Sequence, residues 1–129
     1  MAVSFLTLDE VLAIHGHQID TYSGAAGLRD ARLLESAVAM PQATFGGEHV
    51  HADVYEMAAA YLFHLVKNHA FLDGNKRTGL ACALVFLRLN RVRIAATDNE
   101  LVTLVLAVAR STANKATAAV FLREHARKA

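Results

Sequence analysis

The chain has 129 residues, of which 54% are hydrophobic, and its formal net charge is +1. This length and apolar content suffice for one domain with its own core, while the small charge lacks the basic excess of proteins that bind nucleic-acid backbones. Charged residues interrupt the apolar stretches before any of them reaches the roughly 18 residues of a membrane-spanning helix. With no export signal at the amino terminus, we expect a single domain over residues 1–129 that is cytoplasmic and binds neither nucleic acid directly nor a membrane.

Two helices and a flap are predicted in the first third of the chain. Thr7-Leu8-Asp9-Glu10 matches the capping box that begins many helices. After a loop containing glycine and serine, Asp30 caps a second helix, which Pro41 ends. Residues 41–50, PQATFGGEHV, contain a Gly-Gly pair without helical periodicity. They predict an exposed loop or a small hairpin, of a kind that often contacts a partner.

The middle of the chain predicts two central helices. The first begins after Asp53, continues to about Asn68 and is apolar on most faces, as expected of a helix at the centre of a domain. The second runs from about Lys76 to Leu89, with Asn90 as a left-handed cap. The polar stretch NHAFLDGNKRTG connects the two.

The remaining residues predict further short elements. Residues 91–94 suggest an extended segment, Thr97 to Glu100 form another capping box, and a last helix extends from around Asn114 to Arg127. No repeat or linker is evident. We therefore expect an all-α fold, a single-domain bundle of about six helices with a short flap loop or hairpin.

The polar connection has the composition of an anion site. Its end forms the amino terminus of the second central helix, where unpaired N–H groups and the helix dipole attract negative charge. Gly74 lets an oxygen approach the backbone, and Lys76 and Arg77 add cationic donors for phosphate. Asp73 would repel a phosphate unless a cation intervenes, and Mg²⁺ bridging carboxylate and phosphates satisfies this requirement.

His69 and its neighbours suggest how such a site works. An imidazole titrates near neutral pH and can accept the proton of an incoming hydroxyl. Asn75 either donates to a phosphate or holds the turn, and Phe71 anchors the loop in the core. The pattern indicates transfer of a phosphate-containing group from a Mg²⁺-bound nucleotide, whereas a polar interhelical turn with solvated basic residues is the alternative. The first interpretation requires an opening at His69 and a free Gly74 amide.

Residues 69–77, HAFLDGNKR, resemble the signature of the Fic/Doc family, His-x-Phe-x-Asp/Glu-Gly/Ala-Asn-Gly/Lys-Arg. The similarity extends to GLRDARLLESAV, PQATFGG and TGLACALVFLRLN, and so to most of the chain. It implies that His69 is catalytic, that Asp73 binds Mg²⁺ and that Phe71 is a buried anchor. It also implies phosphate-contacting residues, which are Gly74, Asn75, Lys76 and Arg77. The family's flap, which aligns the target, would include Thr44, Phe45, Gly46 and Gly47.

Two departures from the AMP-transferring members point to the Doc branch of the family. Lys76 stands where those members have glycine, and Leu80 where they have a further arginine. The resemblance therefore implies an ATP- and Mg²⁺-dependent protein kinase toxin that transfers the γ-phosphate to a Ser/Thr hydroxyl of a translation factor, with elongation factor Tu as the leading target. No glutamate is followed by Gly or Asn, so the family's inhibitory motif is missing and a separate antitoxin is expected. AMPylation and a non-catalytic antitoxin-binding module are the alternatives.

Other polar residues admit simpler interpretations. The seven histidines include His15-Gly-His17 and His49-Val-His51, but neither pair has a thiolate partner or the spacing of a helical zinc site. His64, in the apolar helix before the motif, is expected to be a core residue or a support for the site rather than a ligand. Lys67 either adds charge beside the nucleotide or is solvated. The arginines at positions 88, 91 and 93 are expected to be solvated, with antitoxin or target docking as the second possibility.

Overall fold

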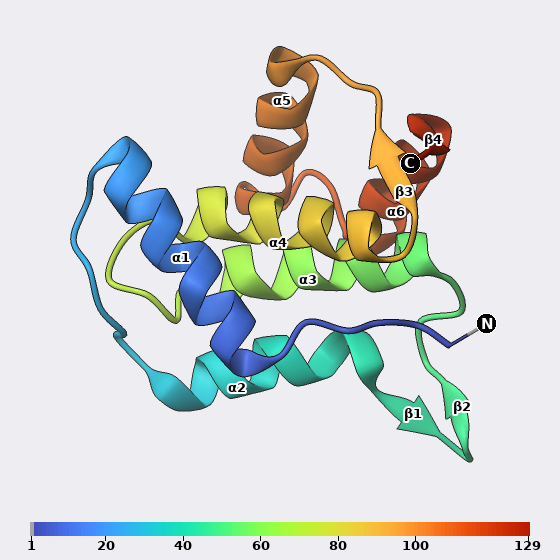
Figure 1. Cartoon of the computed structure of the whole chain (residues 1–129), viewed down its shortest axis with the longest axis horizontal. Helices are drawn as coiled ribbons and strands as arrows, with labels where there is room; N and C mark the ends of the chain where they lie inside the picture. The colour runs from blue at the N-terminus through green and yellow to red at the C-terminus, as the bar shows by residue number, and fades with distance from the viewer. Residues whose placement is uncertain (1) are drawn as a thin grey trace.

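The computed structural model describes residues 2–129, which form six α-helices and two short antiparallel ribbons (Figure 1). This confirms the expected all-α fold. In chain order the elements are α1 (Leu8–Tyr22), α2 (Ala31–Ala39), the 3-10 helix η1 (Met40–Gln42), β1 (Thr44–Phe45), β2 (Glu48–His49), α3 (Val54–Asn68), α4 (Asn75–Leu89), β3 (Val92–Ile94), α5 (Asp98–Ala109), α6 (Lys115–Glu124) and β4 (Ala126–Lys128).

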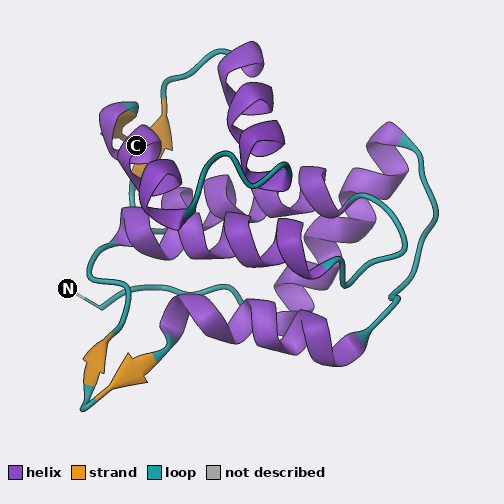
Figure 2. Ribbon diagram, turned by 180° about the vertical axis from the view of Figure 1, so that it is seen from behind, coloured by secondary structure: helices purple, strands orange, loops and turns teal. Residues whose placement is uncertain are grey.

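Helix α3 lies at the centre, antiparallel to α4, and the other helices pack around this pair (Figures 1 and 2). As expected, its buried residues occupy most of its faces; they are Met57, Ala58, Ala59, Ala60, Tyr61, Leu62, Leu65 and Val66. Gly79 allows the close approach of α4. A methyl group there would lie 2.8 Å from Val66 Cγ2 and 3.2 Å from the Leu62 carbonyl oxygen.

Local capping residues set the starts of the helices, as the sequence predicts. Thr7 and Thr97 complete reciprocal capping boxes with glutamates three residues later. Asp30, Asp53 and Asn114 each accept a backbone N–H in the first turn that follows them. These bonds satisfy donors that the helices cannot pair internally.

Two predicted boundaries in the carboxyl-terminal part are wrong. Asn90 is not left-handed, since its φ is −104°, and Arg91 adopts that conformation instead with a φ of +68°. The last helix ends at Glu124 rather than Arg127 because residues 126–128 form β4. This strand pairs with β3, and Arg93 lies opposite Arg127.

The predicted flap is a hairpin. Thr44 pairs with His49 and Phe45 with Glu48. Gly46 and Gly47 have φ values of +61° and +83°, which glycine adopts without the steric cost of a side chain. Phe45 is 86% exposed.

Within residues 2–129, no helix combines the length and apolar character needed to cross a membrane.

The contact at Gly79 yields the first prediction. Gly79→Ala should lower the free energy of unfolding by about 1–3 kcal/mol, because the added methyl group overlaps α3. Gly16→Ala is the matched control, since a methyl group at this position in α1 meets nothing within 4 Å. That substitution should raise stability by about 0.5–1 kcal/mol through helix propensity. Urea denaturation measures both changes, and two changes of the same sign would contradict the packing argument.

Candidate active site at the amino terminus of α4

The loop between α3 and α4 is held by the segment that precedes α2. Leu28 forms an isolated antiparallel bridge with Phe71, and the Leu72 amide donates to the Gly27 carbonyl at 3.1 Å. The Arg29 and Asp30 amides both donate to the Ala70 carbonyl, at 2.8 and 3.0 Å. A segment about 40 residues earlier in the chain thus fixes the backbone of the motif.

Arg29 also caps the carboxyl end of α3. Its Nε donates to the His69 carbonyl at 2.7 Å, and its Nη2 to the Asn68 carbonyl at 3.2 Å. The cation therefore satisfies carbonyls at the negative end of the helix dipole. His69 itself is left-handed, with φ 51° and ψ 47°, which is uncommon for a residue other than glycine. Arg29 is not among the predicted site residues, and the only signal for it in the sequence is its place in the GLRDARLLESAV segment.

His15 supports the motif from α1. Phe71 is 2% exposed, and its ring stacks on the His15 imidazole with centroids 3.7 Å apart and planes 5° apart. The His15 Nε2 donates to the Asp73 carbonyl at 2.8 Å. His15 is therefore a buried support for the loop. In the part of the chain that the structure describes, no three His, Cys, Asp or Glu residues are grouped to hold a metal ion.

Asn75 holds the turn. Its Oδ1 accepts from the Phe71 amide and its Nδ2 donates to the Phe71 carbonyl, both at 3.0 Å. This arrangement uses both ends of the side-chain amide within the loop. Of the two roles considered for Asn75, the structure shows the one that stabilises the turn.

The Gly74 amide is not free, contrary to the requirement set by the sequence interpretation. It donates to Asp73 Oδ1 at 2.8 Å, while Asp73 Oδ2 accepts from the Ala25 amide at 3.3 Å. The hydrogen bonds from Gly74 and Ala25 lower the pKa of the Asp73 carboxyl, which is therefore charged at neutral pH. In the absence of an external anion, the adjacent carboxylate satisfies this donor.

Three other backbone donors remain at this helix end. The amides of Asn75, Lys76 and Arg77 have no acceptor among residues 2–129, and the first amide bonded within the turn is that of Thr78. These unpaired amides form the positive end of the dipole of a 15-residue helix. A cavity of about 440 Å³ lies here, lined by His69, Leu72, Asp73, Gly74, Asn75, Lys76 and Arg77. The exposed His69 therefore borders an opening that also contains the amino terminus of α4, the kind of helix end at which anions commonly bind.

The two predicted cations at positions 67 and 77 are engaged elsewhere. The Arg77 guanidinium donates to the carbonyls of Tyr22 and Ser23, at 3.1 and 2.9 Å, and lies over the Tyr22 ring. Lys67 Nζ donates to the Ala109 carbonyl and to Ser111 Oγ. Lys67 does not line the cavity, so the structure does not bring it to the expected phosphate site. Lys76 is exposed and free to meet a ligand.

The hairpin also lies apart from the motif. It precedes the amino end of α3, whereas the motif follows the carboxyl end, and both views place them at opposite ends of the helix (Figures 1 and 2). A helix of 15 residues is about 22 Å long. The structure therefore does not bring Thr44, Phe45, Gly46 and Gly47 together with His69.

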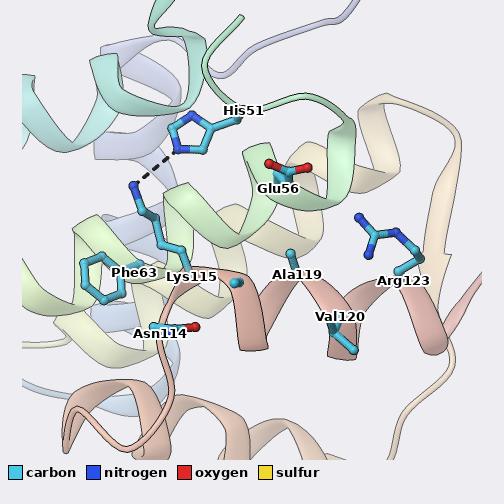
Figure 3. Close-up of a pocket in the computed structure, with 9 residues that line it drawn as sticks. His51, Glu56, Phe63, Asn114, Lys115, Ala119, Val120 and Arg123 are labelled. Carbon is cyan, nitrogen blue, oxygen red and sulfur yellow. Dashed lines mark hydrogen bonds between the residues drawn. The ribbon is translucent and has the colours of Figure 1, made fainter.

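A second cavity, of about 610 Å³, is lined by Lys115 and His51 among other residues, and Figure 3 shows the hydrogen bond between these two side chains. Lys115 Nζ lies 3.3 Å from His51 Nε2 and 3.1 Å from His64 Nε2. Burial and the charge of Lys115 lower the pKa of His64 to about 4, and they lower that of His51 as well. The ammonium group thus donates to two neutral imidazoles. His64 is partly buried, as expected, and serves this cluster.

Comparison with known proteins identifies the family to which this chain belongs. The Fic/DOC family model matches residues 5–87, and the chain belongs to this family. Among its relatives is Toxin Doc from Mycolicibacterium smegmatis, 47% identical over 75 residues, or 58% of each chain. Another is Protein kinase doc from Escherichia phage P1, 37% identical over 86 residues, which are 67% of this chain and 68% of the phage protein. The alignment thus spans less than two thirds of the mycobacterial relative.

The lysine and histidine cluster yields a pH prediction. The unfolded chain protonates His64 near its ordinary pKa of 6.5, whereas the folded chain resists protonation until about pH 4. Stability from this group is complete above pH 6.5 and decreases as the pH falls toward 4. His64→Gln keeps an acceptor for Lys115 but cannot titrate. Between pH 7 and 4.5, the wild type should lose about 1–2 kcal/mol more unfolding free energy than the variant. Parallel losses in urea denaturation would contradict the assignment.

Proposed function

We propose that this protein is a Doc-type toxin that transfers the γ-phosphate of ATP to a Ser/Thr hydroxyl of a translation factor, with elongation factor Tu as the leading candidate. The observation that carries the proposal is that the exposed His69 borders the same cavity as three unpaired amides at the start of α4. Membership of the Fic/DOC family and the names of two relatives, one a toxin and one a kinase, support it.

In the proposed reaction, the amides of residues 75–77 and the Lys76 ammonium bind phosphate oxygens. The hydroxyl oxygen of the target attacks the γ-phosphorus as the bond between that phosphorus and the bridging oxygen of ADP breaks. His69 takes the hydroxyl proton, so the products are a phosphorylated side chain and ADP. Arg29 and the left-handed backbone at residue 69 orient the imidazole over the cavity.

Asp73 suits a Mg²⁺ ion that accompanies the nucleotide. Its carboxylate is exposed, and its lowered pKa keeps it charged. Proteins commonly bind Mg²⁺ through one or two carboxylates while phosphates and water fill the other positions, so one acidic side chain is sufficient. When bound, the ion would offset the negative charge of carboxylate and phosphates. One oxygen of Asp73 would still accept the Gly74 amide.

Lys76 supports γ-phosphate transfer over AMP transfer. Its side chain lines the cavity at a position where AMP-transferring members of the family have glycine, and it therefore occupies part of the space beside the phosphates. The expected result is a nucleotide bound with its terminal phosphate nearest His69. The open cavity and the exposed His69 also leave the site accessible to a separate antitoxin. The sequence supports the same expectation, since the family's inhibitory motif requires a glutamate followed by Gly or Asn and no glutamate of this chain has that neighbour.

Labelled nucleotide tests the proposed reaction. Purified protein is incubated with elongation factor Tu, Mg²⁺ and ATP labelled at either the α or the γ phosphate. We expect label in the target only from the γ position, and His69→Ala should reduce the rate about a hundredfold or more. His17→Ala is the matched control, since His17 is an exposed histidine of α1 outside the cavity, and it should retain full activity.

Each alternative leaves its own signature in this assay. Transfer of the α label alone identifies AMPylation and rejects the kinase. Growth arrest that persists in His69→Ala cells, together with unlabelled target, favours a non-catalytic binding module. Circular dichroism of the variant confirms that any loss of activity does not reflect unfolding.

A further inference from the structure

The β3–β4 ribbon lies at the end of α4 remote from the motif (Figure 1), and arginines are concentrated in it and just before it. Arg93 pairs directly with Arg127, and Arg91 lies in the turn immediately before β3. All three are exposed. Like charges opposite each other across two strands are destabilising, so the ribbon carries an unfavourable pair. We call these three residues the arginine face.

No ion pair among residues 2–129 includes the arginine face, although Arg127 Nη1 donates to the Ala126 carbonyl at 2.7 Å. The ion pairs in this part of the chain join Arg123 to Asp53 and His125 to Glu100. Arg91 adds a second cost, because its φ of +68° is strained for any residue with a side chain. The positive φ of Arg91 belongs to the left-handed turn that ends α4, so the like-charged pair of Arg93 and Arg127 is the feature that an anionic partner would relieve.

The same ribbon has a free edge. Ala95 donates to the His125 carbonyl at 2.8 Å and Ala129 to the Arg91 carbonyl at 3.2 Å, so residues 91, 93 and 95 face β4. By the alternation of an antiparallel ladder, the N–H and C=O groups of Val92 and Ile94 point to the other side. Within residues 2–129 these amides have no acceptor.

A cavity of about 320 Å³ follows this free edge, lined by Leu84, Val85, Arg88, Val92, Arg93 and Ile94. It therefore combines an apolar floor with two exposed arginines and a row of unpaired backbone groups. Each of these features suits a different part of an extended peptide. The backbone would continue the ladder, apolar side chains would enter the cavity, and carboxylates would meet the guanidinium groups.

We propose that the free edge of β3 binds an extended acidic segment of a partner protein as a third strand. Alternate residues of that segment would place carboxylates beside Arg93 and Arg88 and apolar side chains over the cavity. Arginine suits this role because its planar fork binds a carboxylate through two parallel hydrogen bonds. Strand β3 and Arg88 lie beyond residues 5–87, the part matched by the family model, whereas Leu84 and Val85 of the cavity floor lie within it. The proposal is independent of catalysis at His69.

Other occupants fit the surface less well. Pairing of two copies through β3 would bring further arginines together at a cost in stability, and such charges are a common defence of edge strands against self-association. A nucleic acid requires a longer basic surface, whereas this chain has a net charge of +1 and the cavity floor is apolar. An extended acidic peptide matches all three features of the surface: its carboxylates pair with the arginines, its backbone bonds the free edge of β3, and its apolar side chains cover the cavity floor.

Fluorescence anisotropy with designed peptides tests the proposal. The probe is a fluorescein-labelled peptide of alternating glutamate and valine, mixed with the full chain. We expect saturable binding that weakens as salt concentration rises. Arg93→Glu should weaken binding by about tenfold or more, because it places a carboxylate against the peptide. Arg110→Glu is the matched control, since Arg110 is an exposed arginine at the end of α5, and it should leave the Kd nearly unchanged.

A second peptide, methylated at alternate backbone nitrogens, keeps the charge but cannot extend the ladder, and it should not bind. Equal binding of the two peptides would overturn strand addition. Absence of binding by the first peptide up to about 1 mM would overturn the site itself. Tighter binding of single-stranded DNA than of the peptide, lost in Arg93→Glu, would replace the proposed partner with a nucleic acid. Circular dichroism of Arg93→Glu establishes that the variant is folded.

Discussion

The close packing of α3 against α4 is the constraint on which the other features depend. Because Gly79 lets the two helices touch, the end of α3 and the start of α4 lie near each other, and a few residues suffice to join them. That short connection forces His69 into a left-handed conformation and directs the unpaired amides of α4 toward the same opening. At its other end, α4 leads directly to the β3–β4 ribbon. One helix pair therefore positions both surfaces to which we assign binding.

Most polar groups of the motif stabilise the loop. Asn75 binds both backbone groups of Phe71, and Asp73 accepts the Gly74 and Ala25 amides. Arg77 binds the end of α1. Only His69 and Lys76 extend into the cavity without hydrogen-bonded partners in residues 2–129. This division accounts for the density of polar residues between two apolar helices, since a short buried connection must satisfy its backbone and still leave a few groups free for chemistry.

Signals within a few residues of each other predicted the helices well, whereas contacts between residues far apart in the sequence were not predicted. The starts of the helices depend on side chains within the next turn, such as Thr7, Asp30 and Asp53, so the sequence reveals them directly. Strand β4 depends on residues more than 30 positions earlier, and ARK has no strand pattern of its own. Arg29 and His15 support the motif from equally distant positions. The sequence pointed to the cavity-lining residues other than Leu72, but it did not show that Gly74 bonds its neighbour or that Lys67 turns toward the end of α5.

The contacts of Arg77 have an energetic consequence for ligand binding. Its guanidinium already satisfies the carbonyls of Tyr22 and Ser23. An anion that draws this guanidinium away from the two carbonyls must break those bonds and leave the end of α1 uncapped. Occupancy of the loop and order in residues 22–27 are then thermodynamically linked, so each ligand's affinity includes the work of releasing that segment. A molecule that binds the end of α1 would therefore change the affinity of the loop between α3 and α4 for an anion without contacting that loop.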